Sequence, residues 1–487
     1  MDNRFYFGFN TSEERKKRRK AELYSMSEQV STFFWDEAPQ HGLEMREGQQ
    51  DMSFEIVDAL INDQHFAIEA GVGIGKSFGY LVPVLLYSKR MNKPVIIATS
   101  TIALQEQLWR DVHAVMPLLG LNRDVILAKG QTHYLCNKRA DEYMCDPKAD
   151  PPDALKEGIQ QGYEERKDFP EVLPQGIWDK VNVQRFSMKN CGFCEKKCKY
   201  YKVRAALKFT DGVVLCNQDF LTQHLMKLRR GQEGLINAAA DLLVVDEAHN
   251  LDDKVRSATT ERFGQGMLFG MIKSAFYELR SFDQSSVSGE KREAESAIIA
   301  FYNCLKAQVQ KQINEAEQDM RYADRFFFDN NGSAIELLTE MNAAIHNLSS
   351  SIQIYSSMDF RNNRSFAASD DLDAVSESLS ELLDQIDDML IWIEQHGSNT
   401  ELVYCPKNTK EIVSRLYFNG DERTILTSAT LTNATSGSLE EQYSYFISNT
   451  GFPAGDRGCL SEPKPSPYPY DEHAMIYYCD DLPHPTR

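Results

Sequence analysis

The feature that most constrains the fold is a glycine-rich segment between an apolar run and a helical pattern. His65–Glu69 is apolar enough for a buried strand, and a helix is expected to start at Phe78. Small residues are needed between them, because successive backbone N–H groups must curl around a phosphate at a helix N-terminus. The sequence therefore predicts a phosphate-binding loop, formed by Ala70, Gly71, Val72, Gly73, Ile74, Gly75, Lys76 and Ser77.

The last two residues of this loop carry its chemistry. Lys76 is placed to reach the β- and γ-phosphates of a nucleotide, and the Ser77 hydroxyl to ligate Mg²⁺. Ala70 stands where the pattern usually has its first glycine. The predicted cofactors are a nucleoside triphosphate, taken as ATP, and Mg²⁺.

An acidic pair follows a second apolar strand. Leu242–Asp246 is the predicted strand, and Asp-Glu-Ala-His occupies positions 246 to 249. We expect Asp246 to hold the magnesium ion and Glu247 to orient and deprotonate the attacking water. His249 completes the tetrapeptide. The predicted catalytic residues are Lys76, Asp246, Glu247 and His249.

Apolar runs alternate with helical patterns along much of the chain. This alternation predicts an α/β fold built on a doubly wound parallel sheet, with the nucleotide site at its carboxyl edge. Besides the two strands above, the predicted strands are Val95–Thr99, Val125–Ala128, Val213–Cys216 and Thr424–Thr427.

The net charge of −19 is unevenly distributed. Residues 183–230 contain 11 Lys and Arg against 3 Asp and Glu, whereas residues 251–400 contain 13 against 25. A local positive field determines where phosphates bind, so the total excludes no polyanionic partner.

The longest apolar stretch, Leu81–Leu86, is too short to span a bilayer. No signal peptide is visible, which predicts a reducing, cytoplasmic location.

Three cysteines lie within eight residues, at Cys191, Cys194 and Cys198. Such short spacing lets one loop supply three corners of a metal site while a distant residue closes the fourth. Cys136 is the predicted fourth ligand, and Cys145 is its alternative. Four thiolates suit either a tetrahedral zinc ion or a four-iron cluster, and thiol spacing alone slightly favours zinc, because structural zinc sites are common.

These motifs occur in an order that resembles the XPD/DinG iron–sulfur helicases of superfamily two, most closely the bacterial DinG-like branch. The resemblance extends over nearly the whole chain. Arg46–Met52 is similar to the adenine-reading segment of that family, and Thr99–Leu108 to a DNA-contacting motif. Lys129–Cys136 and Cys198–Arg204 are similar to the two ends of its cluster segment, and Leu426–Leu431 to its Ser-Ala-Thr motif.

The resemblance implies an ATP-dependent helicase that moves from 5′ to 3′ on DNA in repair or replication. It implies a [4Fe–4S] cluster rather than zinc, with Arg46 and Gln49 added to the nucleotide-binding residues. Expected partners are single-stranded DNA and forked or hybrid duplexes, bound by a monomer. Tyr200 or Tyr201 would stack on a base, or else both are buried packing residues. The phosphates would be held by Lys196, Lys197, Lys199, Lys202 and Arg204.

The resemblance also gives a domain plan based on a RecA-like sheet. The first motor domain is expected over residues 1–130, 206–255 and 401–440. A cysteine-rich iron–sulfur domain is inserted at 131–205, and an all-helical arch at 256–400. A helix is expected over 372–393, because its apolar residues repeat at intervals of three and four: Leu372, Val375, Leu379, Leu383, Ile386, Leu390 and Ile393.

The end of the chain is predicted to be a linker. Only 56 residues follow Leu431, whereas a second motor domain needs on the order of 150. Residues 441–487 are therefore expected to lead into a second motor domain that is missing, in a chain that is either a truncated fragment or a naturally shortened homologue. This expectation leaves an alternative function open, that of a module that binds ATP and single-stranded DNA without productive unwinding.

Overall fold

The computed structural model describes residues 12–44, 46–184, 198–279, 284–316, 324–358 and 367–468, together with residues 472 and 475. The chain divides into two compact units. The first contains the residues up to Val255 and those from Lys410 onward, and the second is Arg256–Thr409. Each unit has its own apolar core, so each is described by itself.

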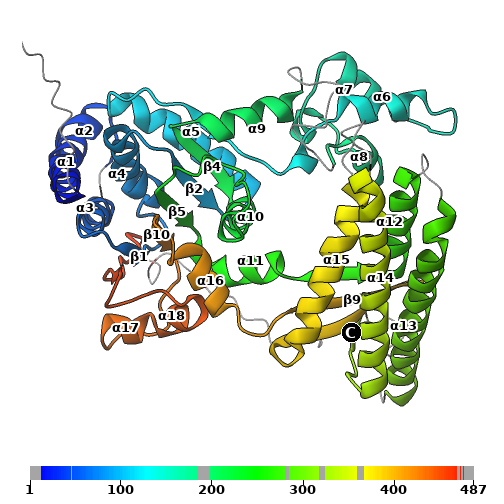
Figure 1. Ribbon diagram of the computed structural model, residues 1–487. Coiled ribbons are helices and arrows are strands. Elements are labelled where there is room, and N and C mark those ends of the chain that lie inside the picture. The colour runs from blue at the N-terminus through cyan, green and yellow to red at the C-terminus, as the bar shows by residue number, and fades with distance from the viewer. Residues whose placement is uncertain are drawn as a thin grey trace, which may run out of the picture. The chain divides into compact units, whose positions relative to one another are not determined.

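A seven-stranded sheet forms the centre of the first unit (Figure 1). All of its strand pairs are parallel, and the strand order is β11-β1-β10-β5-β2-β4-β3. The strands are β1 (His65–Glu69), β2 (Val95–Thr99), β3 (Val125–Leu127), β4 (Val213–Asn217), β5 (Leu242–Asp246), β10 (Arg423–Ser428) and β11 (Gly458–Leu460). The predicted strands thus lie in one parallel sheet.

Alternate residues of these strands enter separate apolar cores on the two faces of the sheet. Phe66 and Ile68 pack on one face and Ala67 on the other. The first face is covered by α1 (Ser12–Thr32), α3 (Glu47–Ile61), α4 (Lys76–Met91) and α5 (Ile102–Leu118). The second is covered by α9 (Lys199–Phe209), α10 (Gln218–Arg229), α16 (Lys410–Tyr417) and α18 (Ser444–Thr450). The predicted doubly wound sheet is therefore confirmed, and it fits a RecA-like fold.

Between β3 and β4 the chain forms a small helical region around the buried indole of Trp178. Its helices are α6 (Asn137–Cys145), α7 (Asp153–Gln160) and α8 (Gln175–Val181). The Trp178 Nε1–H donates to the carbonyl oxygen of Thr132 at 2.6 Å, which ties the end of this region to its beginning. Short helices elsewhere in the chain are α2 (Ala38–Gln40), α11 (Leu251–Ala258) and α17 (Leu439–Gln442).

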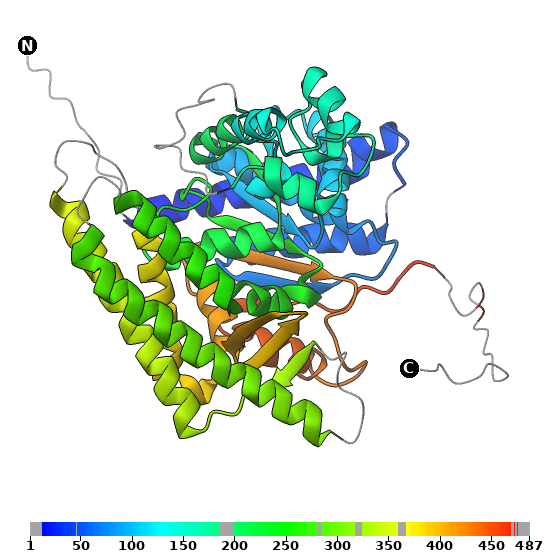
Figure 2. The ribbon, with the colours of Figure 1, turned by 90° about the vertical axis from the view of Figure 1, so that its right-hand side faces the viewer.

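The second unit combines long helices with a four-stranded antiparallel sheet, so the prediction of an all-helical arch is wrong. The strand order is β6-β9-β8-β7. The strands are β6 (Glu261–Gly264), β7 (Arg325–Phe327), β8 (Met389–His396) and β9 (Asn399–Pro406). Three long helices lie side by side in Figure 2, namely α13 (Ser288–Glu315), α14 (Gly332–Met358) and α15 (Ala367–Asp384), and α12 (Gln265–Glu278) packs with them.

The helix predicted over 372–393 ends early, at Asp384. A short 3₁₀ turn at Ile386–Asp388 follows, and Leu390 and Ile393 belong to β8. The side chains of Ile391, Trp392 and Ile393 favour an extended backbone, because β-branched and aromatic side chains pack well on a pleated surface. The predicted boundary at residue 400 also falls inside β9, which pairs with β8 along its whole length.

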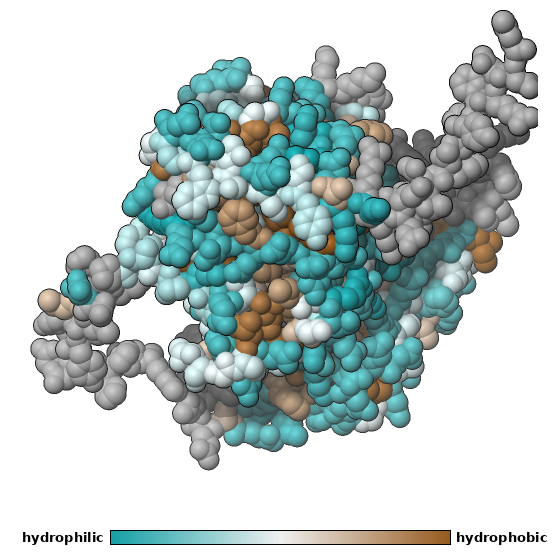
Figure 3. All heavy atoms as spheres, turned by 90° about the vertical axis from the view of Figure 1, so that its left-hand side faces the viewer, coloured by the Kyte–Doolittle hydropathy of each residue, from teal (hydrophilic) through white to brown (hydrophobic). Residues whose placement is uncertain are grey.

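The face of the molecule in Figure 3 is mainly hydrophilic, with apolar residues in small separate groups. Among the described residues, no helix combines the length and the apolar character needed to cross a membrane.

Candidate nucleotide-binding site

The glycine-rich loop lies between the end of β1 and the start of α4. Its backbone requires glycine at two positions, because φ is +89° at Gly73 and +87° at Gly75. Ile74 is buried in the core of the first unit and Val72 is exposed. The loop therefore turns back on itself and leads directly into the helix that begins at Lys76.

The predicted catalytic residues meet at the carboxyl edge of the sheet. The Lys76 Nζ atom lies 3.1 Å from Oε1 of Glu247, and both side chains are largely buried. Strand β10 separates β1 from β5 in the sheet, so the loop and the acidic pair approach each other across one intervening strand. This edge is where ligands bind in open α/β sheets.

Asp246 lies deeper in the site than Glu247. Burial raises the pKa of the Asp246 carboxyl to about 6, against the opposing effect of Lys76. The hydroxyl of Tyr80 donates to Asp246 Oδ2 at 3.4 Å, and burial keeps the pKa of that phenol well above its usual range. A carboxylate in such a place gains from a divalent cation, which offsets the cost of burying its charge.

The backbone at Glu247 is left-handed, with φ +56° and ψ +46°. This conformation is uncommon for a residue with a side chain and needs support from its surroundings. Gln218 supplies that support, because its Nε2 donates to the carbonyl oxygens of Asp246 at 2.7 Å and of Glu247 at 3.0 Å. Gln218 was not predicted as a site residue. Its position just past the carboxyl end of β4 is the signal that would have identified it.

A polar network joins the acidic pair to β10. His249 Nδ1 lies 2.6 Å from the Ser428 hydroxyl oxygen and 3.3 Å from Glu247 Oε2. Glu69, at the end of β1, accepts hydrogen bonds on Oε2 from the N–H groups of Leu431 and Thr432, both at 2.6 Å. The Ser-Ala-Thr segment and the residues just after it are thus hydrogen-bonded to the end of β1 and to the motif that follows β5.

Arg46 and Gln49 lie beside the loop at the start of α3. Gln49 Nε2 donates to the Gly75 carbonyl at 2.9 Å, and the side chain is 6% exposed. Its Oε1 atom is buried and accepts no hydrogen bond in the part of the chain that the structure describes. A nucleotide that offers a donor would satisfy this oxygen.

Two of the predicted cluster ligands share one small apolar group of side chains. Cys136 and Cys198 both pack around Tyr134 and Tyr200. Cys145 is exposed at the far end of α6, about 13 Å along the helix from Cys136. Cys191 and Cys194 lie outside the described residues, as do Lys196 and Lys197. The residues that the structure describes contain no group of three or more possible metal ligands.

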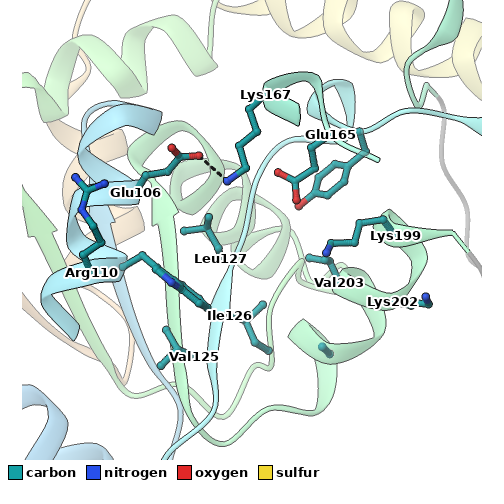
Figure 4. A pocket seen from close by; sticks show the side chains of 13 residues that line it. Glu106, Arg110, Val125, Ile126, Leu127, Glu165, Lys167, Lys199, Lys202 and Val203 are labelled. Carbon is teal, nitrogen blue, oxygen red and sulfur yellow. Dashed lines mark hydrogen bonds and ion pairs between the residues drawn. The ribbon is translucent and has the colours of Figure 1, made fainter. Parts of the chain in front are cut away.

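A pocket of about 650 Å³ opens beside this cysteine region, between α5 and α9 (Figure 4). Lys199 and Lys202, the predicted phosphate contacts, line this pocket together with Trp109 and Arg110, which were not predicted as site residues. Tyr200 is 6% exposed and packs with a ring-centroid distance of 5.1 Å against Tyr134, so it is a packing residue, and of the two tyrosines only Tyr201 is left as a candidate for base stacking.

Arg204 is also held by the fold. Its Nη1 donates to the carbonyl oxygen of Leu235 at 2.7 Å, so the guanidinium is engaged in tertiary structure.

Comparisons with known proteins agree with these motifs. The DEAD_2 family model matches residues 132–266. YpvA of Bacillus subtilis, named a probable ATP-dependent helicase, is 24% identical over 92% of this chain and 69% of its own length. The 3'-5' exonuclease DinG of Bacillus subtilis is 25% identical over 89% of this chain and 50% of its own length.

The ATP-dependent helicase DinG of Mycobacterium tuberculosis is 30% identical over 44% of this chain and 35% of its own length. The chain thus spans between about a third and two thirds of the length of these three relatives. By its motifs, its site geometry and these matches, the chain is similar to the DinG-like helicases.

Proposed function

We propose that this chain binds and hydrolyses ATP with Mg²⁺ as the motor part of a DinG-type DNA helicase. The observation that carries the proposal is the approach of Lys76 to Glu247 at 3.1 Å, next to the buried carboxyl of Asp246. One cation and two carboxylates at the edge of a parallel sheet suit a triphosphate with its magnesium ion.

Each residue has a distinct role in this proposal. The backbone N–H groups of Val72, Gly73 and Gly75 would surround the phosphates, and Lys76 leaves Glu247 to pair with them. Ser77 and Asp246 hold Mg²⁺, directly or through water. Glu247, freed from Lys76, then accepts the proton of the attacking water, and His249 links it to Ser428. Arg46 and Gln49, at the start of α3, would contact the base.

The nucleic-acid side of the proposal is single-stranded DNA that passes the pocket between α5 and α9. Lys199, Lys202 and Arg110 would neutralise phosphates, and the indole of Trp109 offers a stacking face. By resemblance to DinG-like proteins, we propose movement from 5′ to 3′, binding to forked or hybrid duplexes, and a cytoplasmic monomer that acts in DNA repair or replication.

The third part of the proposal is a [4Fe–4S] cluster held by Cys136, Cys191, Cys194 and Cys198, with zinc as the alternative metal. The packing of Cys136 and Cys198 around the same two tyrosines fits a shared site, and the position of Cys145 favours Cys136 as the fourth ligand. The cluster would stiffen the region that borders the DNA pocket. Iron and zinc analysis of the purified protein tests this part, and Cys198→Ser should lose the metal while Cys145→Ser retains it.

A steady-state ATPase assay with and without single-stranded DNA tests the motor proposal. Turnover should require Mg²⁺ and disappear in Lys76→Ala, whereas Lys89→Ala, an exposed lysine later in the same helix, should leave it intact. Turnover that survives in Lys76→Ala would refute the assignment of the loop. ATP and DNA binding without turnover would favour the alternative function, a binding module.

A further inference from the structure

A segment from the end of the described chain runs along the phosphate-binding loop. We call Ser461–Tyr468 the strap. It follows β11 and continues beside the end of β1, where the Ser461 N–H donates to the Ala67 carbonyl at 3.0 Å and the Lys464 N–H to the Glu69 carbonyl at 2.8 Å. The Gly71 N–H in turn donates to the Lys464 carbonyl at 2.9 Å. The strap is therefore bonded to the loop itself.

Side chains fix the strap on both sides. Lys464 Nζ lies 2.7 Å from Glu55 Oε1 and 3.6 Å from Asp51 Oδ2, both on α3. The buried phenol of Tyr443 accepts from the Glu69 N–H at 2.8 Å and donates to the Ser461 carbonyl at 3.0 Å. Such contacts hold the strap in one position, because each would have to break before it could leave.

The strap brings an aromatic ring onto the loop. A Cβ atom added at Gly73 would collide with the Tyr468 ring, and one added at Gly71 would lie 2.7 Å from the backbone nitrogen of Ser466. The Tyr468 ring can lie this close to the loop backbone because Gly73 has no side chain. Tyr468 is 49% exposed, and the Arg46 guanidinium lies 6.0 Å from the ring centroid.

We propose that Tyr468 is a stacking residue for the base of the nucleotide, with Arg46 as its cationic neighbour. The inference rests on the proposed function, because it requires a nucleotide on the loop. The base of a nucleotide held by its phosphates must lie beyond the loop, and a half-exposed ring fixed at the loop offers a flat apolar face there. Aromatic rings and guanidinium groups both stack on bases.

The opposite role is obstruction, in which the ring covers the loop and a nucleotide must displace it. The two roles predict opposite results for one substitution. Stacking means that Tyr468→Ala weakens nucleotide binding, and obstruction means that it strengthens binding.

Titration of the full chain with ATP and with inorganic tripolyphosphate separates these roles. Tyr468→Ala should raise the Kd for ATP about tenfold and leave the Kd for tripolyphosphate unchanged, since stacking on one base contributes on the order of a tenfold effect. Tyr468→Phe should bind ATP as the wild type does. Tyr445→Ala, at an exposed tyrosine on α18, is the matched control.

The fluorescence of 2-aminopurine riboside triphosphate gives a second readout, because stacking quenches it. Quenching should occur with the wild type and Tyr468→Phe, and be lost with Tyr468→Ala. An unchanged or lower Kd for ATP in Tyr468→Ala would overturn the stacking role while leaving the proposed function in place. A wild-type chain that binds neither ATP nor tripolyphosphate would overturn both.

Discussion

Nδ1 of His249 lies 2.6 Å from the hydroxyl oxygen of Ser428. The two residues lie at the ends of different strands: His249 comes shortly after β5, and Ser428 is the last residue of β10. The Ser428 hydroxyl oxygen also lies 3.4 Å from Glu247 Oε2, so one hydroxyl contacts both Glu247 and His249. The position of the residue proposed to activate water therefore depends on the Ser-Ala-Thr segment.

Replacing Ser428 with alanine should slow hydrolysis more than it weakens binding. The substitution removes a hydrogen bond to Glu247 and one to His249, but leaves the loop untouched. We expect kcat for ATP to fall about 10- to 100-fold, as for the loss of one bond to a charged group, with the Kd for ATP unchanged. Ser448→Ala, at an exposed serine on α18, is the control. If the affinity for ATP and kcat fell by equal factors, Ser428 would not act mainly by positioning Glu247.

The carboxylate of Glu69 should control the mobility of the segment after β10. Its Oε2 accepts from two backbone N–H groups and from the Thr432 hydroxyl at 2.8 Å. Glu69→Ala leaves these donors without their acceptor, so the amides of Leu431 and Thr432 should exchange with deuterium at least tenfold faster. Glu69→Gln keeps an acceptor oxygen and should show a smaller effect. Equal exchange rates in all three proteins would refute this role.

Acid should destabilise the first unit through its buried histidines. His65 is fully buried, and Nδ1 accepts from the Thr424 N–H at 3.1 Å while Nε2 lies 3.1 Å from the Phe418 carbonyl. Burial lowers the pKa of His65 to about 4, with contributions from Arg423 and Arg457. The unfolded chain takes up a proton near pH 6.5 and the folded chain does not, so stability is lost as pH falls from 6.5 to 4.

His65 alone should lower the free energy of unfolding by about 3 kcal/mol at pH 4, relative to pH 7. Urea unfolding of the first unit between pH 7 and pH 4.5, followed by hydrogen exchange of β1 amides, measures it. His65→Gln should be less stable at pH 7 but should depend less on pH, whereas the exposed His41→Gln should keep the wild-type profile. A His65→Gln profile parallel to the wild type would contradict the assignment.

The sequence predicts those site residues that belong to a recognisable motif. Lys76 and Glu247 could be paired in advance because a strand–loop–helix and a strand ending in carboxylates are typical of one sheet edge. Gln218 and Glu69 lie at strand ends, which indicates this edge of the sheet, but their partners could not be predicted, because those depend on the strand order β1-β10-β5-β2-β4, which no local pattern encodes. The strap was predicted to be a linker, since its alternate prolines give no strand signal. The N–H groups of Ser461 and Lys464 nevertheless bond to β1.

The buried strands of the parallel sheet were predicted well for a physical reason. Strands covered on both faces are short continuous apolar runs, as in Leu242–Val245, and such runs are hard to mistake. Strand β11 has only three residues, Gly458–Leu460, and its pairing with β1 is a product of tertiary packing. The antiparallel β8 was mistaken for helix, because Leu390 and Ile393 happen to continue the spacing of α15.

Leu390 and Ile393, which led to the wrong helix prediction, can also be used to test the assignment of β8 as a strand. In a helix, residues 390 and 393 would share one face, and both would be buried. In β8 they point to opposite faces, and Leu390 is 45% exposed while Ile393 is fully buried. Ile393→Ala should therefore cost about 2–5 kcal/mol and Leu390→Ala less than about 1 kcal/mol. Hydrogen exchange of α13 amides in increasing urea reports the stability of this unit, and similar costs for both substitutions would argue for the helix.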